Sequence, residues 1–549
     1  MRIIRVVGIV FLVSVFYSSA LCQERFVEAT YDLYSKGQLI GRDVAQFHYH
    51  QDGFLEEVSG VSTISTSGIT VIVNHYAALA EGARLIEYRT ELRAAGQKQI
   101  VTAHPQGNDM LVSVAGSSKV LKGQADAVLM DNNLAAHFQI LVEWLKSGYG
   151  DSRSGFMIGP IFQGALSIEA FPMPPRECTI EKSIETDFWL VRIGSNVAQI
   201  WVDSDGRFLR VRNPRGGYEF RLTDLSCPPD AIPLPDYIDM STFQEIPGNL
   251  QVRNETLSGL FCIPNGEGLF PGIVLVHGSG ANDRDETIGP NKPFRDLAHG
   301  LATREIASFR YDKRSYAIPD SVSPTEWDLN VETIDDAVAA LDLLRTQAKV
   351  DSTQVFVLGH SLGGFAVPYI AEKDGLVTGF ISLAGNTRSL DQLTLEQYYY
   401  LGALDGLSAD EVERESASTF ADLERIRSGN FSDDEKLHNA YGFYWRDLMT
   451  RDPASKAVTL PFPALILQGE RDYQVTMEDF DGWIKAYENA KRTDYTAISY
   501  PELNHLFLKG CGEPNPGEYM LEGYVDERVI RDIAEWISSL TPVLNWSIY

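Results

Sequence analysis

Two patterns of hydrophobic and polar positions divide the chain. Between residues 24 and 228, apolar and polar residues alternate in short runs that are separated by turn sequences such as Gln51-Asp52-Gly53. Alternation with a period of two is typical of strands with one buried face, and closely spaced turns join such strands into hairpins. One stretch, Leu134 to Leu145, has apolar residues at helical spacing instead. This part of the chain is therefore predicted to be a smaller β-rich domain, in which a twisted antiparallel sheet packs against one helix.

The pattern changes after a proline-rich linker at residues 229–242. Short apolar, β-branched runs now alternate with amphipathic helical segments such as 331–348, and this alternation is typical of an α/β fold with a mostly parallel, doubly wound sheet. Polar helical sequence at about 387–458 interrupts the alternation and is predicted to form a helical cap. The second domain is expected to span residues 243–543.

The N-terminus has the pattern of a secretory signal peptide. Arg2 and Arg5 precede an apolar run from Val6 to Phe16, and small residues follow at 18–20. Such an order is typical of a cleaved leader, and the run is short for a membrane span. Residues 1–22 are thus predicted to be a signal peptide that is cleaved near residues 20–22, leaving a periplasmic or secreted protein. A lipoprotein anchored through Cys22 is the less favoured alternative, because Leu21 is bulky where a small residue is expected.

The most informative motif lies at residues 355–364. An apolar run ends in Gly359-His360-Ser361-Leu362-Gly363, which is the G-x-S-x-G pattern of a nucleophile elbow. In such an elbow a tight strand-to-helix turn exposes a serine hydroxyl at the N-terminus of a helix. The alternative is a glycine-rich turn without chemistry, but the strand-like run before the motif favours Ser361 as a nucleophile. The predicted fold is then that of an α/β-hydrolase.

A serine nucleophile needs a general base and an orienting carboxylate. Of ten histidines, only His505 follows both Ser361 and a plausible acid strand, so the order Ser, acid, His selects it as the base. Asp472 follows the buried-type run at 464–469 and is the predicted acid. Glu470 and Asp479 are the less favoured alternatives for the acid.

Two backbone N–H groups are expected to bind the oxyanion of the reaction. One belongs to Leu362, directly after the nucleophile, and the other comes from a loop after an earlier strand. The run Ile273 to Val276 ends in His277-Gly278-Ser279-Gly280 and supplies that loop. Ser279 is the predicted second donor, with its neighbour Gly280 as the alternative. His277 and His360 are expected to shape the loops.

The segment after this loop carries a resemblance to a known family. HGSG at 277–280 runs into the charged sequence NDRDETIGPNKPF at 282–294. In this respect residues 243–540 resemble bacterial α/β-hydrolases of the EstD-type carboxylesterase family, which are serine esterases most active on short acyl esters. The resemblance implies Ser361, Asp472 and His505 as nucleophile, acid and base, with Ser279 and Leu362 at the oxyanion positions. Ala281 departs from the proline that the family pattern has at this place.

Composition narrows the set of partners. The formal net charge of −28 argues against nucleic acid and anionic membranes as partners. No phosphate-binding glycine loop, metal-ligand cluster or nucleotide fingerprint occurs, so the sequence predicts no cofactor and no metal. His48 and His50 alternate along a predicted strand without a matching carboxylate or cysteine cluster, and are read as ordinary sheet residues.

Four cysteines follow the leader: Cys178, Cys227, Cys262 and Cys511. An exported protein can form disulfides. Pairing within each domain, Cys178 with Cys227 and Cys262 with Cys511, is the simplest of three arrangements.

Three functions remain open at this point. The first is an exported serine carboxylesterase acting on a small-molecule ester, and the second is a serine aminopeptidase or amidase with the same triad. Glu411, Glu413 and Glu415 would favour the peptidase if they formed a site for a free amine. The third is an envelope protein whose N-terminal domain, similar to the half-barrels of LolA-type proteins, binds a ligand or partner while the hydrolase domain is vestigial. Oligomeric state and the acyl and alcohol groups are not predicted.

Overall fold

The computed structural model describes residues 25–540, with short gaps at 67–68, 131–133, 147–151, 161–162, 181, 195, 214–216, 224, 226–233, 320 and 322. The predicted signal peptide and the start of the predicted linker lie outside the described residues. Among the described residues, no helix combines the length and the apolar character that crossing a bilayer requires.

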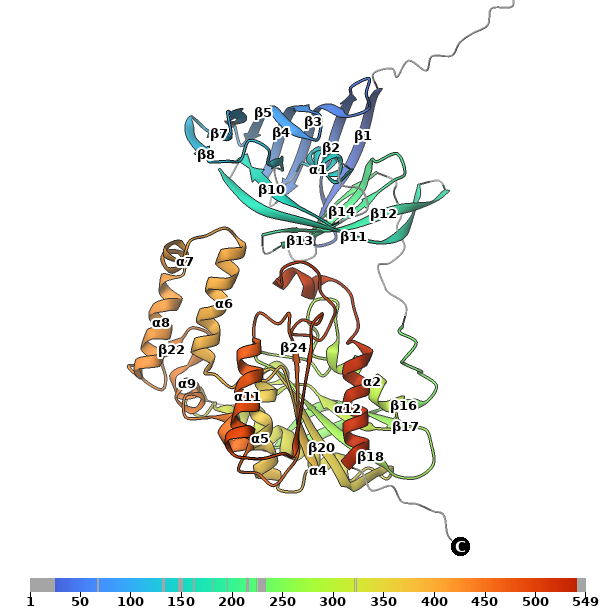
Figure 1. The fold of residues 1–549 in the computed structure, drawn as a ribbon, viewed down its shortest axis with the longest axis vertical. Helices are drawn as coiled ribbons and strands as arrows, with labels where there is room; N and C mark the ends of the chain where they lie inside the picture. The colour runs from blue at the N-terminus through green and yellow to red at the C-terminus, as the bar shows by residue number, and fades with distance from the viewer. Residues whose placement is uncertain are drawn as a thin grey trace, which may run out of the picture.

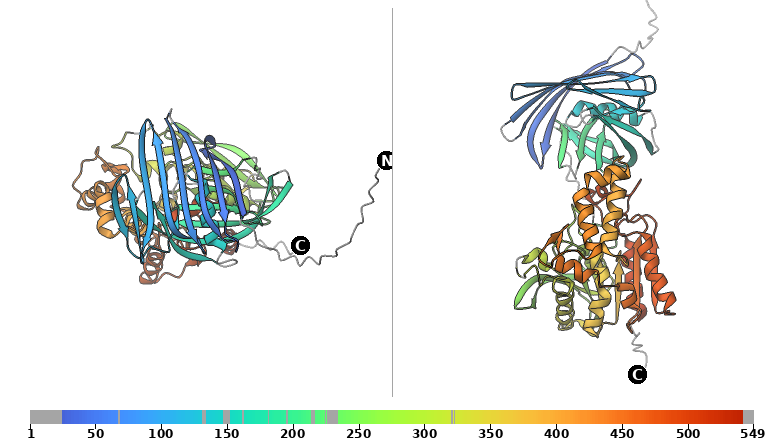
Figure 2. Two further views of the ribbon diagram at one scale, coloured as in Figure 1. Left: turned by 90° about the horizontal axis from the view of Figure 1, so that it is seen from above. Right: turned by 90° about the vertical axis from the view of Figure 1, so that its left-hand side faces the viewer.

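The N-terminal part of the chain is one large, almost entirely antiparallel sheet that curls around a helix (Figures 1 and 2). Within the described residues its fifteen strands follow the order β8-β7-β6-β5-β4-β3-β2-β1-β15-β14-β13-β12-β11-β10-β9, and only the short pair β9–β10 is parallel. The strands are β1 (Arg25–Ser35), β2 (Gln38–Tyr49), β3 (Leu55–Thr66), β4 (Ile69–Ala80), β5 (Arg84–Ala94), β6 (Gln97–Gln106), β7 (Asp109–Val114), β8 (Ser117–Leu121), β9 (Val128–Leu129), β10 (Arg153–Gly159), β11 (Gly164–Ile180), β12 (Lys182–Ile193), β13 (Asn196–Val202), β14 (Phe208–Asn213) and β15 (Tyr218–Leu222). β1 pairs with β15, so the first and last strands of the domain meet in the middle of the sheet.

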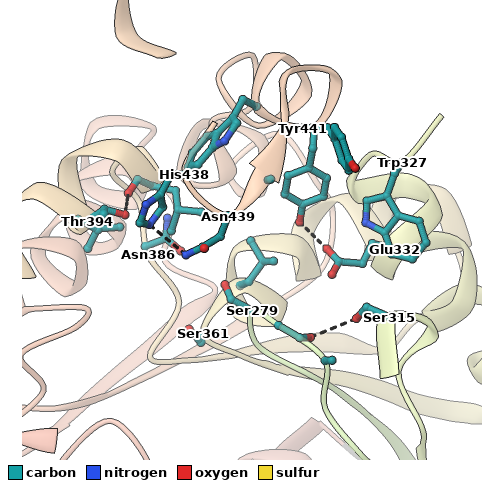
Figure 3. Close-up of a pocket in the computed structure, with 18 of the residues that line it drawn as sticks. Ser279, Ser315, Trp327, Glu332, Ser361, Asn386, Thr394, His438, Asn439 and Tyr441 are labelled. Atoms are coloured by element: carbon teal, nitrogen blue, oxygen red, sulfur yellow. Dashed lines mark hydrogen bonds between the residues drawn. The ribbon is translucent and has the colours of Figure 1, made fainter. Parts of the chain in front are cut away.

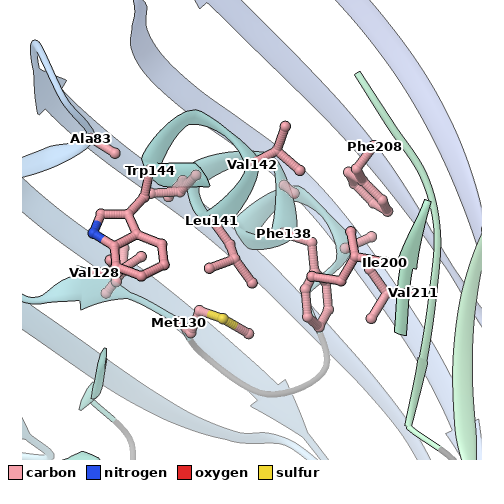
Figure 4. Close-up of a cluster of buried hydrophobic side chains, with 14 of the residues drawn as sticks. Ala83, Val128, Met130, Phe138, Leu141, Val142, Trp144, Ile200, Phe208 and Val211 are labelled. Atoms are coloured by element: carbon pink, nitrogen blue, oxygen red, sulfur yellow. The ribbon is translucent and has the colours of Figure 1, made fainter. Parts of the chain in front are cut away.

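The predicted helix is present as α1 (Ala135–Lys146) and fills the hollow of this sheet. Phe138 and Leu141 point into an apolar core that includes Ile200 and Phe208 from the surrounding strands (Figure 4). Almost every side chain of α1 is buried, and the helix is accordingly apolar around most of its circumference, as is typical of a core helix.

A polar cluster lies inside this otherwise apolar core. Asp43 and His75 are fully buried, with 3.3 Å between Oδ1 and Nε2, and Oδ2 of Asp43 accepts the backbone N–H of Ala136 at the start of α1. The ring of His137 packs edge-on against His75 and Tyr88. Burial, followed by the charge of nearby His75, holds the pKa of His137 well below its usual value.

The C-terminal part has the predicted α/β architecture, the α/β-hydrolase fold. Eight strands follow the order β16-β17-β19-β18-β20-β21-β24-β25, and they are parallel from β19 onward. The strands are β16 (Phe243–Val252), β17 (Glu255–Pro264), β18 (Phe270–Val276), β19 (Ala307–Tyr311), β20 (Val350–His360), β21 (Gly379–Leu383), β24 (Ala464–Gly469) and β25 (Tyr495–Tyr500). Helices α2 (Pro293–Ala302) and α12 (Glu527–Leu540) contribute to the core on one face, and α4 (Asp335–Arg345), α5 (Leu362–Asp374) and α11 (Met477–Asn489) to the core on the other.

Two predicted helices are interrupted in the structure. The helix expected at 331–348 begins as a π-helical turn, η2 (Asn330–Ile334), and continues as α4. The cap helix expected at 409–426 divides at Ser416 into α7 (Ala409–Glu415) and α8 (Ala417–Ser428).

Between β21 and β24 the chain leaves the sheet and forms the predicted cap. Its elements are α6 (Leu390–Leu404), α7, α8, β22 (Lys436–Leu437), β23 (Ala440–Tyr441), α9 (Gly442–Leu448) and α10 (Pro453–Ala457). Helices α6 to α8 rise toward the N-terminal sheet (Figure 1).

The predicted disulfide between Cys262 and Cys511 is wrong, because both thiols are free. Cys262 lies in the core beneath the hydrolase sheet, whereas Cys511 packs against the core of the N-terminal domain, so the two side chains belong to different cores. Cys178 is disulfide-bonded, and its predicted partner Cys227 lies outside the described residues.

The buried histidine of the N-terminal core makes a pH-dependent contribution to stability. Below a pH of about 6.5 the unfolded chain binds a proton at residue 137 that the folded chain does not bind, so the free energy of unfolding falls as the pH falls, by up to about 1.4 kcal/mol per pH unit. We expect His137→Phe to remove this part of the slope, measured by urea unfolding at pH 7.0, 6.0 and 5.5. His104→Phe, at an exposed histidine of the same domain, is the matched control, and a slope unchanged in His137→Phe would contradict the assignment.

Candidate active site

Four loops at one edge of the hydrolase sheet carry the residues that the sequence singles out. Ser279 follows β18, Ser361 follows β20, Asp472 follows β24 and His505 follows β25. All four strands are parallel, so their carboxyl ends meet at the same edge, where open α/β sheets bind ligands.

Ser361 occupies a strained turn between β20 and α5. Its backbone has φ 54° and ψ −118°, which a residue with a side chain adopts at a cost of about 1–3 kcal/mol. The glycine at 363 permits the turn, because a Cβ there would lie 2.2 Å from the carbonyl oxygen of Val276 in the neighbouring strand. The elbow expected from the motif is thus present, with Ser361 directly before the first turn of α5.

Asp472 and His505 are in direct contact. Asp472 Oδ2 lies 2.6 Å from Nδ1 of His505, and both side chains are buried. Oδ1 of the same carboxylate accepts the backbone N–H groups of Gln474 and Val475, which fix its orientation. A carboxylate on Nδ1 places the proton of a neutral imidazole there and leaves Nε2 as the basic nitrogen.

The two alternative acids have other partners. Glu470 accepts a hydrogen bond from the hydroxyl of Ser499 and is exposed. Asp479 is buried but binds the backbone of Thr387 and the guanidinium of Arg388. Neither carboxylate is the hydrogen-bond partner of His505 in the described structure.

His360 connects the nucleophile loop to the histidine loop. Its ring lies 4.7 Å from the ring of His505, its Nε2 is 2.8 Å from the backbone carbonyl oxygen of His505, and its Nδ1 forms a 3.0 Å ion pair with buried Glu286. Burial is the largest single influence on His360 and favours the neutral imidazole, but the charge and hydrogen bond of Glu286 and the hydrogen bond with the His505 carbonyl together raise its pKa. Burial is likewise the largest influence on Glu286, but the charge and hydrogen bond of His360, the charge of His277 and the N–H of Gly278 together lower its pKa. The predicted loop-shaping role of His360 therefore takes the form of a buried ion pair.

The predicted oxyanion groups lie next to Ser361. A Cβ on Gly278 would lie 2.9 Å from Cβ of Ser361, so the loop that carries Ser279 packs directly against the nucleophile. Leu362 is the first residue of α5, and its N–H is one of the four that a helix start leaves without an intrahelical partner.

A cavity of about 920 Å³ opens above these residues. Ser279, Ser361 and Leu362 line its floor, and cap residues such as His438 and Tyr441 lie across from them (Figure 3). Among the described lining residues, Glu332 is the one carboxylate and no lysine or arginine occurs, so the cavity suits an uncharged ligand with apolar and hydrogen-bonding parts.

Some aromatic residues of the cap line the cavity and others pack elsewhere. Tyr441 and Trp445 line the cavity. Tyr398 and Tyr399 instead pack around Phe420, and Tyr400 stacks on Tyr473. Sequence reasoning did not single out several other lining residues, namely Trp327, Glu332, Asn386, His438, Tyr444 and Gln474. Their contribution depends on tertiary packing, for which the sequence pattern at these positions gives no signal.

The glutamates of α7 do not form an amine site. Glu411 caps its own helix through Ser408, and Glu413 accepts the hydroxyl of Tyr399. Neither these residues nor Glu415 lines the cavity.

The N-terminal domain contacts the loops that hold the acid and the histidine. Arg471, next to Asp472, forms an ion pair with buried Glu518, which also accepts the amide of Asn504, next to His505. Burial raises the pKa of Glu518 although Arg471 opposes the change. Cys511 and Leu521, on either side of Glu518 in the sequence, pack against the N-terminal core.

Comparisons with known proteins show to which family the chain is related. Residues 273–531 match the model of the alpha/beta hydrolase family. Esterase EstD of Thermotoga maritima is 41% identical over 304 residues, which are 55% of this chain and 70% of that protein. Among solved structures, Est1E from Butyrivibrio proteoclasticus is 16% identical, with a TM-score of 0.36, and covers 54% of this chain and 98% of its own. An esterase from Pyrococcus furiosus is 12% identical, with a TM-score of 0.37, and covers 57% and 97%.

The ion pair beneath the N-terminal domain is expected to be important for stability. Arg471→Met leaves the Glu518 carboxylate buried without its cation, so we expect it to lower the free energy of unfolding by about 3–5 kcal/mol at pH 7. The loss should shrink at pH 5, where the unpaired carboxyl is more easily protonated. Arg446→Met, which breaks the exposed pair with Asp433, is the matched control and should cost less than about 1 kcal/mol in urea unfolding. Equal costs for the two variants would contradict this account.

Proposed function

Because this chain belongs to the alpha/beta hydrolase family and is a relative of Esterase EstD, we propose that it is an exported serine carboxylesterase. The observation that carries the proposal is the hydrogen-bonding contact between Asp472 and His505. The ring of His505 packs against that of His360, the residue before the strained Ser361, and Ser361 lies at the floor of the cavity. Strain at a nucleophile is retained where it exposes a reactive group, and a carboxylate on Nδ1 is the arrangement that a base for serine requires.

In the proposed reaction, Ser361 Oγ attacks the carbonyl carbon of the ester. The hydroxyl proton passes to Nε2 of His505, and the carbonyl oxygen becomes an oxyanion. The bond to the leaving alcohol then breaks, and His505 returns the proton to the alcohol oxygen. Water repeats the sequence on the acyl-enzyme, so that its proton passes through His505 back to Ser361 and the carboxylic acid is released.

Asp472 and the oxyanion loop have supporting roles in this scheme. Asp472 holds the His505 ring and stabilises its protonated form. The N–H groups of Ser279 and Leu362 stabilise the oxyanion, at about 3 kcal/mol for each donor. Every proton transfer uses a side chain of this chain or water.

The neutral lining of the cavity supports esters over amine-bearing substrates. The one lining carboxylate, Glu332, already pairs with Lys313 and accepts the hydroxyl of Tyr444. A peptidase that selects a free N-terminal amine needs an unpaired carboxylate at that place. No observation among the described residues therefore supports the aminopeptidase alternative. For the binding-protein alternative, no observation among them outweighs the contact of Asp472 with His505, which favours an active enzyme.

Export is supported by the disulfide of Cys178 together with the leader-like sequence at 1–22. Disulfides persist in oxidising compartments and are rare in the cytosol. The N-terminal domain would then fold outside the cytoplasm along with the hydrolase domain.

Loss of the nucleophile should abolish ester hydrolysis. We expect Ser361→Ala to lower kcat on p-nitrophenyl esters by at least about 10⁴-fold, and Asp472→Asn by about 10⁴-fold, because the serine or the correct histidine tautomer is lost. The wild type should react with a fluorophosphonate probe and Ser361→Ala should not. Glu470→Gln, at the neighbouring exposed carboxylate, is the matched control for Asp472→Asn. Full turnover by Ser361→Ala would contradict the proposal.

The place of cleavage tests export. Expressed with residues 1–22 in a bacterium that has a periplasm, the protein should be recovered from the periplasm or medium with a new N-terminus just after residue 20 or 22, as N-terminal mass spectrometry would show. Substitution of Arg2 and Arg5 by Glu should retain it in the cytoplasm. An intact N-terminus in the wild type, or a lipid-modified Cys22, would contradict cleavage to a soluble form.

A further inference from the structure

Buried charged groups bind the two peptide bonds on either side of the Gly278 Cα: Glu286 binds the His277–Gly278 peptide, and Lys313 binds the Gly278–Ser279 peptide. The N–H of Gly278 donates to Oε1 of Glu286 at 2.7 Å. The carbonyl oxygen of Gly278 accepts Nζ of Lys313 at 2.7 Å and, more weakly, the amide of Asn282 at 3.3 Å. Ser279 lines the cavity (Figure 3), whereas neither Lys313 nor Glu286 is among the lining residues.

The contact with Lys313 determines where the N–H of Ser279 points. No peptide bond among the described residues is cis. In a trans peptide the C=O and the following N–H point in opposite directions. Because Lys313 binds the carbonyl of Gly278, the N–H of Ser279 points away from the ammonium group, and Ser279 itself lines the cavity together with Ser361.

Lys313 is an unusual residue to find behind such a loop. Its side chain is only 2% exposed, and burying an ammonium group is costly unless it is paired and hydrogen-bonded. Glu332, itself 8% exposed, supplies the countercharge at 3.1 Å. Two apolar side chains would fill this space without the cost of burying two charges. The contact between the Lys313 ammonium group and the carbonyl oxygen of Gly278 therefore indicates what the charge does.

We infer that Lys313, held by Glu332, is a positioning residue that orients and polarises the Gly278–Ser279 peptide for oxyanion binding. An ammonium group on a carbonyl oxygen forms a strong, charge-assisted hydrogen bond. Hydrogen bonds in a chain strengthen one another in a medium of low dielectric constant, so the N–H of the same peptide becomes a better donor. This inference rests on the proposed function, and it adds Lys313, which does not line the cavity, together with its countercharge Glu332, which does.

The same chain of contacts reaches the cap. Tyr444 of α9 donates its hydroxyl to Glu332, and both side chains line the cavity. A polar path therefore leads from the cap through Glu332 and Lys313 to the oxyanion peptide. A ligand that displaces Tyr444 would act on the peptide through this path.

The test is a paired substitution that removes both charges together, Lys313→Met with Glu332→Gln, so that neither is left buried alone. We expect kcat on a p-nitrophenyl ester to fall about tenfold with little change in KM, a part of the roughly 10²-fold to 10³-fold loss that follows removal of a whole donor. Affinity for a trifluoromethyl ketone, which forms an oxyanion adduct with a catalytic serine, should fall by the same factor. Lys373→Met, which breaks the exposed pair with Asp335, is the matched control and should leave both values unchanged.

A merely structural role for Lys313 predicts a different result. If the double variant keeps kcat and ketone affinity within about twofold of wild type while Ser361→Ala is inactive, the positioning role is overturned and the proposed function stands. If Ser361→Ala retains turnover, the proposed function and this inference both fail. Should the double variant not fold, the milder pair Lys313→Gln with Glu332→Gln decides, because it removes both charges and keeps a hydrogen-bonding side chain at each position. A parallel loss of about threefold or more in kcat and ketone affinity supports the inference, and unchanged values overturn it.

Discussion

The close approach of β18 and β20 is the constraint on which the rest of the site depends. These strands are parallel neighbours, with Val276 opposite Gly359 at their carboxyl ends. The chain then turns so tightly that a Cβ at Gly363 would lie 2.2 Å from the carbonyl oxygen of Val276, and one at Gly278 would lie 2.9 Å from Cβ of Ser361. Two backbones can pack this closely only without side chains between them. The strain at Ser361 and the position of the oxyanion loop both follow from that contact.

Buried charges hold the loops that this contact brings together. The run Asp283 to Glu286 has four charged residues in a row. Two of them have buried or charged partners: Asp285 pairs with Arg310, and Glu286 is buried against His360 and Gly278. Buried pairs stabilise little after desolvation, but they fix geometry, because removing either partner leaves an unpaired charge. Because these pairs gather around the candidate site, we infer that they fix the positions of its loops.

The sequence predicts the nucleophile, acid and base candidates because each lies directly after a strand-like run, in the order that the fold requires. Asp472 and His505, 33 residues apart, meet because β24 and β25 are adjacent and parallel, which is a local consequence of the fold. Contacts that depend on tertiary packing cannot be predicted from the order of strands and motifs in the sequence. A lysine after a strand does not reveal that it will be buried on the carbonyl of Gly278, and cysteine spacing did not show that Cys262 and Cys511 belong to different cores.

The relation between the two domains is the least predictable part of the structure and explains why the polar loop after His505 is ordered. Tyr400 of the cap stacks on Tyr473, beside the acid, and Tyr473 stacks on Tyr519, so three distant segments form one aromatic column. The N-terminal sheet covers the same region, since Cys511 and Leu521 pack against its core. The loop packs against the hydrolase domain through Leu506, Leu508 and Tyr519, which form a buried cluster with Ile288 and Tyr473. Because Cys511 and Leu521 of the same loop pack against the N-terminal core, the loop that carries His505 is supported from outside the hydrolase fold as well as from within it.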